Sequence, residues 1–202
     1  MTAEASIYDF NLRQLFFRKI RLTSPLDSVQ RLFQVPAENI DTDVHFVRLT
    51  LTDKSHHAIS SNFYWLPKKL STFDWSVEHE KQHPYYTGVT TYEDLSMLSQ
   101  LQRVHVDASA TAGRRSEGEE VLVRIHNPSK NLAFQIHLSI VDGENGEEVL
   151  PALWDDNYFS LMPGEARAVA AHYSSAANAA RLRLAVNGWN IDAESIFVNR
   201  SN

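Results

Sequence analysis

The chain has no cysteine and few glycines, with 7 in 202 residues. Without cysteine there are no disulfide bonds, no thiolate nucleophile and no cysteine-based zinc site. The low glycine content argues against the glycine-rich loops that cradle phosphate-bearing cofactors, and no such motif occurs. We therefore expect no cofactor.

Two further absences narrow the class of protein. No apolar run approaches 18 residues, so no membrane-spanning helix is predicted. There is no basic excess either: 19 Lys and Arg face 25 Asp and Glu, a net charge of -6, which disfavours a nucleic-acid partner. The first ten residues lack the charged and then apolar layout of a secretion signal, so the sequence indicates no compartment.

What is present is a repeated strand pattern. Short apolar stretches alternate with a period of two and are separated by turn residues, which predicts an all-β protein built from sandwiches. The first half predicts strands over residues 6–12, 15–23, 29–35, 44–52 and 58–66. The second half predicts strands over residues 104–110, 120–126, 133–141, 148–150, 157–161, 166–173, 181–187 and 195–198. In 44–52 we expect the core face to carry His45, Val47, Leu49 and Leu51.

The pattern divides the chain into two modules. Residues 68–102 interrupt the alternation and predict an ordered linker with one short helix, capped by Thr90 or Thr91 with Glu93 or Asp94 in its first turn. Residues 103–202 have the length and strand number of one immunoglobulin-like sandwich. Residues 1–67 predict only five strands, which is a partial sandwich of the same kind.

One short motif suggests a metal site. His79, Glu80 and His83 have the H-E-x-x-H spacing of zinc hydrolases. Pro84 disfavours helical geometry at His83, and the surrounding residues show no apolar helical stripe. We interpret the motif as a solvated loop and predict no metal, with a zinc hydrolase as the rival hypothesis.

The sequence Asp155-Asp156-Asn157 invites a calcium or acid/base interpretation. The D-x-D-x-D-G pattern of a calcium loop is absent, and nothing sets two carboxylates across a cleft. We favour a strand-entry turn in which the side chains satisfy backbone groups. Aromatic side chains are also frequent enough to include a sugar-stacking platform or to pack in a sandwich core; they are Tyr64, Trp65, Trp75, Tyr85, Tyr86, Trp154, Tyr158 and Trp189.

Three segments go beyond a generic β pattern: SNFYWL at 61–66, VLPALWDDNYFSLMPGE at 149–165 and Gly188-Trp189-Asn190. Together they resemble the C-terminal part of family 2 glycoside hydrolases. The similar branches are the exo-β-D-glucosaminidases and the β-mannosidase-type enzymes, including mannosylglycoprotein endo-β-mannosidase. The resemblance covers nearly the whole chain and implies two immunoglobulin-like β-sandwiches in tandem, the first lacking its N-terminal strand.

The resemblance also implies what the chain does not do. In that family the catalytic glutamates belong to a (β/α)₈ barrel that precedes these domains, and a barrel of about 250 residues has no counterpart here. The resemblance therefore implies a non-catalytic region of a retaining glycosidase acting on β-linked glucosamine or mannose, with no catalytic residue in this chain. Its partner would be the barrel, and the parent enzymes are often secreted or periplasmic.

The resemblance further suggests a substrate-binding loop at residues 153–158. Trp154 would stack on a sugar of the parent's substrate, Asp155 or Asp156 would hydrogen-bond it, and Tyr158 would complete the subsite. Two alternatives stay open: an independent carbohydrate-binding module, and an adhesion or assembly sandwich. The unpaired edge of the first module would also permit self-association with another copy.

Overall fold

The computed structural model describes all residues except 36–39, 77–80, 83–84, 116–117, 174–180 and 201–202. The protein is all-β, and its described residues contain no helix long and apolar enough to cross a membrane. The chain forms two compact units, Met1–Gln100 (unit 1) and Leu101–Asn202 (unit 2). Each unit is described by itself below.

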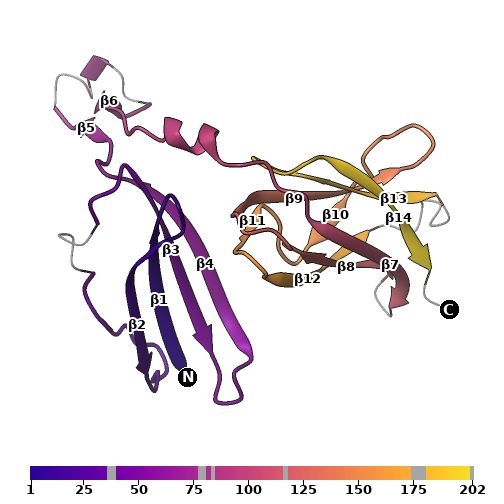
Figure 1. The fold of residues 1–202 in the computed structure, drawn as a ribbon, viewed down its shortest axis with the longest axis horizontal. Helices are drawn as coiled ribbons and strands as arrows, with labels where there is room; N and C mark the ends of the chain where they lie inside the picture. Colours follow the sequence, from indigo (N-terminus) through magenta and orange to yellow (C-terminus); the bar gives the residue numbers. More distant parts are fainter. Residues whose placement is uncertain (36–39, 77–80, 83–84, 116–117, 174–180, 201–202) are drawn as a thin grey trace. The chain divides into compact units, whose positions relative to one another are not determined.

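Unit 1 contains a four-stranded antiparallel sheet in the order β2-β1-β3-β4 (Figure 1). A separate two-stranded sheet is made by β5 and β6, and a single 3-10 turn, η2, follows. Their bounds are β1 Thr2–Asp9, β2 Gln14–Arg21, β3 Val44–Thr52, β4 Ala58–Pro67, β5 Thr72–Asp74, β6 Gly88–Thr91 and η2 Ser96–Gln100. The described residues of unit 1 hold no second large sheet packed on the first.

Two expectations for the strands of unit 1 are wrong. Residues 29–35 form no strand: Val29 is fully exposed, and Phe33 packs its ring on Phe16 without joining a ladder. In β3 the deepest side chains are Val44 and Phe46, on the face opposite to the one predicted. Phe46 is completely buried because it packs between Phe10 and Phe63, whereas the Val47–Leu51 side chains are only partly buried.

The linker also differs from its prediction. Residues 72–74 and 88–91 pair as a hairpin that the sequence pattern did not indicate. The predicted short helix appears as the 3-10 turn η2, and its capping side chain is Asp94, whose Oδ1 accepts a hydrogen bond from the Ser96 amide at 2.9 Å. Thr90 and Thr91 belong to β6 and do not cap this turn.

Unit 2 contains eight strands in the order β10-β12-β8-β7-β14-β13-β9-β11. The pair β7–β14 is parallel, and dividing the order there gives two four-stranded antiparallel layers. This is an immunoglobulin-like sandwich in which the first strand also pairs with the last. The bounds are β7 Asp107–Arg115, β8 Gly118–His126, β9 Ala133–Asp142, β10 Ala152–Trp154, β11 Phe159–Leu161, β12 Ala166–Tyr173, β13 Leu182–Asn187 and β14 Glu194–Arg200.

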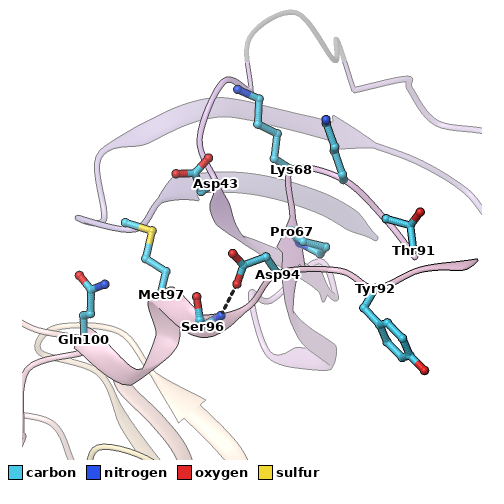
Figure 2. A pocket seen from close by; sticks show the side chains of 10 residues that line it. Asp43, Pro67, Lys68, Thr91, Tyr92, Asp94, Ser96, Met97 and Gln100 are labelled. Atoms are coloured by element: carbon cyan, nitrogen blue, oxygen red, sulfur yellow. Dashed lines mark hydrogen bonds between the residues drawn. The ribbon is translucent and has the colours of Figure 1, made fainter. Parts of the chain in front are cut away.

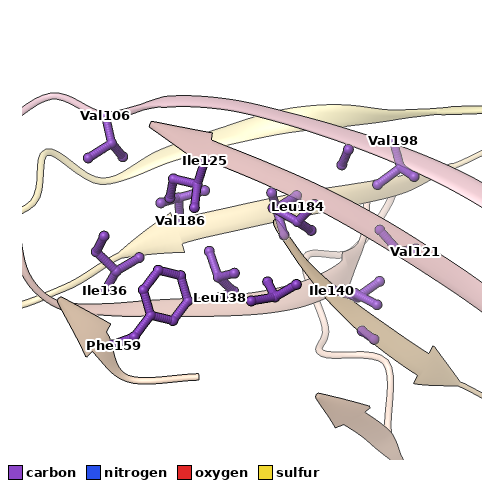
Figure 3. Packing of buried hydrophobic residues seen from close by; sticks show 14 of the residues in the cluster. Val106, Val121, Ile125, Ile136, Leu138, Ile140, Phe159, Leu184, Val186 and Val198 are labelled. Carbon is purple, nitrogen blue, oxygen red and sulfur yellow. The ribbon is translucent and has the colours of Figure 1, made fainter. Parts of the chain in front are cut away.

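The core of unit 2 lies between these two layers (Figure 3). Alternate residues of β8 such as Val121 and Ile125 point inward and meet Leu138 and Ile140 of β9 and Leu184 of β13, all at most 1% exposed. The predicted strand at 148–150 is wrong, because only one isolated bridge joins Glu148 to Val141 there. The strand of that region is β10, which pairs with β12.

Candidate functional site

The predicted subsite loop connects β10 to β11. Because β10 pairs with β12 and β11 pairs with β9, the loop passes from one layer of the unit 2 sandwich to the other. Loops that cross at the end of a sandwich are held by the strands on both sides and are common places for ligand contacts. The residues of this loop are therefore positioned by contacts with β12 in one layer and with β9 in the other.

The side chains of Trp154 and Asp155 mainly contact other residues of unit 2. Trp154 is partly buried and packs against the hydrophobic core, opposite Ala171 in the ladder. Asp155 continues that pairing: its amide donates to the Ala170 carbonyl at 2.9 Å, and its Oδ2 accepts from the Ala170 amide at 3.3 Å. Much of the Trp154 ring is therefore turned to the protein.

Asp156 is exposed and forms an ion pair with Arg167 of β12. The Arg167 guanidinium also lies over the Phe159 ring, 4.8 Å from its centroid. A cation over an aromatic face is attracted by the ring quadrupole, so this contact adds to the ion pair in fixing Arg167. The arrangement presents a carboxylate at the surface that is already oriented by its partner.

Asn157 fastens this loop to the neighbouring strand β9. Its side chain pairs with Leu138 of β9 as a strand would: Oδ1 accepts from the Leu138 amide and Nδ2 donates to the Leu138 carbonyl, each at 2.9 Å. Oδ1 also accepts from the Tyr158 amide at 3.0 Å. The interpretation of this segment as a turn whose side chains satisfy backbone groups is confirmed.

Tyr158 is the predicted residue with the most accessible ring, at 60% exposure. Its backbone has a positive φ of 56°, and its ring stacks on His137 of β9 with centroids 4.5 Å apart. His137 Nδ1 lies 3.1 Å from Asn187 Oδ1. The stack places an oriented aromatic surface beside the loop, and no local sequence signal linked His137 to Tyr158.

The G-W-N segment, in contrast, has a structural role. Asn190 is buried, and its side chain accepts from the Phe134 amide at 2.8 Å and donates to the Gln102 and Leu132 carbonyls at 2.7 Å each. A Cβ on Gly188 would lie 2.7 Å from the Gln135 carbonyl oxygen, which explains the glycine. Trp189 is 57% exposed and meets Phe134 edge-on.

The H-E-x-x-H motif falls on residues 79–83, and its His79, Glu80 and His83 lie outside the described residues. Within the part of the chain that the structure describes, no group of three acidic or histidine side chains is placed to hold a metal ion. The prediction that the motif is not a metal site stays a prediction.

Comparison with known proteins decides the family. The family model described as "Exo-beta-D-glucosaminidase Ig-fold domain" matches residues 84–191. This chain belongs to that family. The assignment confirms the resemblance to the C-terminal immunoglobulin-like domains of these enzymes, and specifically to the exo-β-D-glucosaminidases. The matched residues include the end of unit 1 and most of unit 2.

Relatives extend the likeness over most of the chain. An exo-β-D-glucosaminidase of Arthroderma benhamiae is 34% identical over 174 residues, 86% of this chain and 18% of that protein. The Streptomyces avermitilis enzyme of the same name is 33% identical over 75% of this chain and 17% of its own length. This chain thus spans about a fifth of the length of the curated relatives that it matches.

Solved structures agree with this assignment. The crystal structure of the Amycolatopsis orientalis exo-chitosanase CsxA superimposes with a TM-score of 0.78 at 25% identity, covering 98% of this chain and 23% of that enzyme. A variant of the same enzyme in complex with PNP-β-D-glucosamine gives a TM-score of 0.76 at 25% identity over the same shares.

Proposed function

We propose that this chain is a non-catalytic β-sandwich region of an exo-β-D-glucosaminidase, and that it supports a catalytic part supplied elsewhere in the longer enzyme. The observation that carries the proposal is the match of nearly the whole chain to about a fifth of enzymes that bear that name. A catalytic (β/α)₈ barrel needs about 250 residues of alternating strands and helices, whereas the two units described here are all-β.

The proposed substrate class is a β-linked glucosamine glycoside, because the named relatives act on that sugar. Mannose glycosides are the second branch of the sequence resemblance and find no support among these relatives. The proposed partner is the catalytic barrel of the same enzyme, on which the two units would pack.

The chain alone should not hydrolyse the substrate. We expect the purified chain to release no p-nitrophenol from PNP-β-D-glucosamine above the buffer blank, at enzyme concentrations where an intact relative is active. Measurable turnover that increases with chain concentration would contradict the non-catalytic assignment.

A chimera tests the supporting role. The region of the Amycolatopsis orientalis enzyme that matches this chain is deleted in one variant and replaced by this chain in another. We expect the deletion to lose soluble, active enzyme and the replacement to restore both. A deleted enzyme that stays as stable and active as the intact one would refute the proposal.

Within the longer enzyme, we propose that the loop at residues 153–158 reaches the sugar. Tyr158 carries the exposed ring and Asp156 the exposed carboxylate, with Trp154 and Asp155 holding the loop and adding edge contacts. In the active chimera, Tyr158→Ala and Trp154→Ala should each raise KM by about tenfold with little change in kcat, as expected when ground-state binding is lost.

Phe197→Ala is the matched control for this subsite. Phe197 is an aromatic residue of the same unit with 68% exposure, on β14 and not in the loop. Its KM should equal that of the parent chimera. An unchanged KM in the Tyr158→Ala and Trp154→Ala variants would refute the subsite proposal.

The second candidate is an independent carbohydrate-binding module. It is favoured by the exposed rings of Tyr158 and Trp189, because sugars stack their apolar C–H faces on such rings. It differs from the first candidate in predicting sugar affinity in the isolated chain that Tyr158→Ala or Trp189→Ala abolishes.

A further inference from the structure

Unit 1 contains a hollow that is lined by residues of this unit. It has a volume of about 620 Å³ and lies between the start of β3, the end of β4 and the segment from β6 through η2 (Figure 2). Small-molecule sites usually span roughly 300–1,000 Å³, so the hollow has the right size for one or two sugar rings.

The lining combines charge, hydrogen-bonding groups and apolar surface. Asp43 and Asp94 contribute carboxylates, and Pro67 and Met97 contribute apolar surface. Further polar groups come from Thr91, Ser96 and Gln100. Sugars require this mixture, because each ring presents hydroxyl groups at its edge and C–H groups on its faces.

The segment that closes the hollow is held in place. The Glu93 amide donates to Ser71 Oγ at 3.2 Å, and Ser71 Oγ donates to Glu93 Oε2 at 3.1 Å. The Ser96 amide donates to Asp94 Oδ1, as drawn in Figure 2. Hydrogen bonds from Ser96 hold the pKa of Asp94 below its ordinary value, which keeps this carboxylate charged.

The basic residues at the hollow do not cancel its negative charge. Lys68 Nζ lies 2.6 Å from Asp41 Oδ1, and in Figure 2 its side chain extends away from Asp94. This pair raises the pKa of Lys68 and lowers the pKa of Asp41, so both stay charged and neutralise one another. Asp43 also attracts Lys68, and Lys69 is the second lysine of the lining. With Asp41 included, three carboxylates and two lysines leave one negative charge at the hollow.

One exposed aromatic ring lies at the rim of this hollow. Tyr92 lines the hollow and is 78% exposed, with its ring directed outward (Figure 2). Elsewhere in unit 1, Phe73 of β5 and the following Trp75 are 48% and 77% exposed, with ring centroids 6.0 Å apart; neither lines the hollow. A hollow with an exposed ring at its rim suits an oligosaccharide that fills the hollow with one unit and stacks the next on Tyr92.

We propose that this hollow, with Asp43 and Asp94 inside and Tyr92 at its rim, is a binding site for a cationic amino-sugar oligosaccharide. The ammonium group of a glucosamine unit would receive charge-assisted hydrogen bonds from the carboxylates, and the adjacent ring would stack on Tyr92. The choice of sugar rests on the proposed function, since the relatives of this chain are named for glucosamine glycosides.

The test is a calorimetric titration of the full chain at slightly acid pH with the β-1,4-linked glucosamine tetramer. The fully N-acetylated tetramer serves as the neutral comparison. We expect the glucosamine tetramer to bind and the acetylated one to bind at least about tenfold more weakly, because acetylation removes the cation. No binding of the glucosamine tetramer, or equal binding of both, would overturn the proposal.

Variants of the lining residues test whether the sugar binds in this hollow. Asp43→Asn keeps the shape and removes the charge, and Tyr92→Ala removes the ring; each should weaken binding about tenfold or more. The matched controls are Asp27→Asn and Tyr85→Ala, two exposed residues of unit 1 that do not line the hollow, and both should bind within twofold of the parent chain. Circular dichroism confirms that every variant is folded.

Equal affinity in Asp43→Asn and the parent chain would also refute this site. These outcomes are separable from the proposed function: a chain that binds no sugar and releases no p-nitrophenol keeps its supporting role and loses only this site. Conversely, hydrolysis by the chain would refute the supporting role whatever the titration gives.

Discussion

Both units are built from strands with alternating apolar residues, but they differ in how deeply those side chains are buried. In unit 2 two layers face one another, so Leu184 and Val186 of a single strand are both at most 1% exposed. In unit 1 the main sheet buries Val44 and Phe46 of β3 completely, but the following stretch Val47–Leu51 of the same strand remains partly exposed. A strand pattern therefore guarantees a buried face only where the chain supplies a second layer to cover it.

The difference extends to the surface. Unit 1 exposes large apolar side chains on several elements, among them Phe17, Ile59 and Tyr64 on the main sheet and Trp75 near the hairpin. Unit 2 exposes fewer such side chains, among them Trp189 and Phe197. Large exposed apolar groups are typical of surfaces that contact a partner. This contrast agrees with the proposal that unit 1 contacts the rest of a longer enzyme, and that unit 2 completes its own core.

The largest expected effect compares one leucine in each unit. Leu184→Ala removes a completely buried side chain from unit 2 and should lower the free energy of unfolding of that unit by about 3 kcal/mol. Leu49→Ala removes a partly buried one from unit 1 and should cost about 1 kcal/mol. Chemical denaturation followed by probes in each unit measures both, and equal losses would remove the distinction.

The next effect concerns the buried asparagine of unit 2. Asn190→Ala breaks three hydrogen bonds to backbone groups, two of them to carbonyls at 2.7 Å, and should destabilise unit 2 by about 2 kcal/mol. Asn199→Ala, an exposed asparagine of β14, is the control and should change the unfolding free energy by less than about 0.5 kcal/mol. Similar losses in both variants would mean that Asn190 does not bridge these segments.

A pH effect should appear in unit 1. His45 is buried, and desolvation lowers the pKa of its imidazole below the ordinary value of 6.5, so the folded unit keeps it neutral. The unfolded chain then binds more protons below about pH 6.5, and unit 1 loses stability as the pH falls through that range.

His45→Leu should flatten this pH dependence, which thermal unfolding at pH 5 and pH 7.5 measures. His172→Gln, an exposed histidine of unit 2, is the control and should leave the dependence as it is. If the stability of the His45→Leu variant depends on pH as strongly as that of the parent chain, other titratable groups cause the effect.

The smallest effect is expected at Tyr173. Its hydroxyl is buried and has no hydrogen-bond partner among the residues that the structure describes, and burial raises the pKa of the phenol. Removing a buried group that forms no hydrogen bond is nearly neutral or stabilising. Tyr173→Phe should therefore unfold at the same temperature as the parent or slightly above it; a drop of several degrees would reveal a partner.

The sequence predicted unit 2 more completely than unit 1. Its strands stand between turn residues such as Asn127-Pro128 and Met162-Pro163-Gly164, and β13 alternates between buried and less buried positions. In such strands the hydrophobic period and the positions of the turns predicted the same structure. The same alternation misled at residues 29–35, where the chain has no neighbouring strand. The hairpin of β5 and β6 was missed because three or four residues carry too little periodicity to detect.

The candidate loop could be predicted only in part. Its turn character followed from Asp155-Asp156-Asn157, because short polar side chains bond nearby backbone groups. The partner of Asn157 is Leu138, and the ring under Tyr158 is His137, both in a strand about 20 residues earlier. Such pairings depend on how strands are ordered in the sheet, which a local pattern does not encode.

Amide hydrogen exchange of the full chain, resolved by peptide, tests the contrast between the units most directly. We predict that amides in β8, β9 and β13 exchange only through global opening of unit 2, at least about a hundredfold more slowly than amides in β3 and β4 of unit 1. Equal protection of the central strands in both units would contradict the claim that two facing layers protect unit 2 more than the single main sheet protects unit 1.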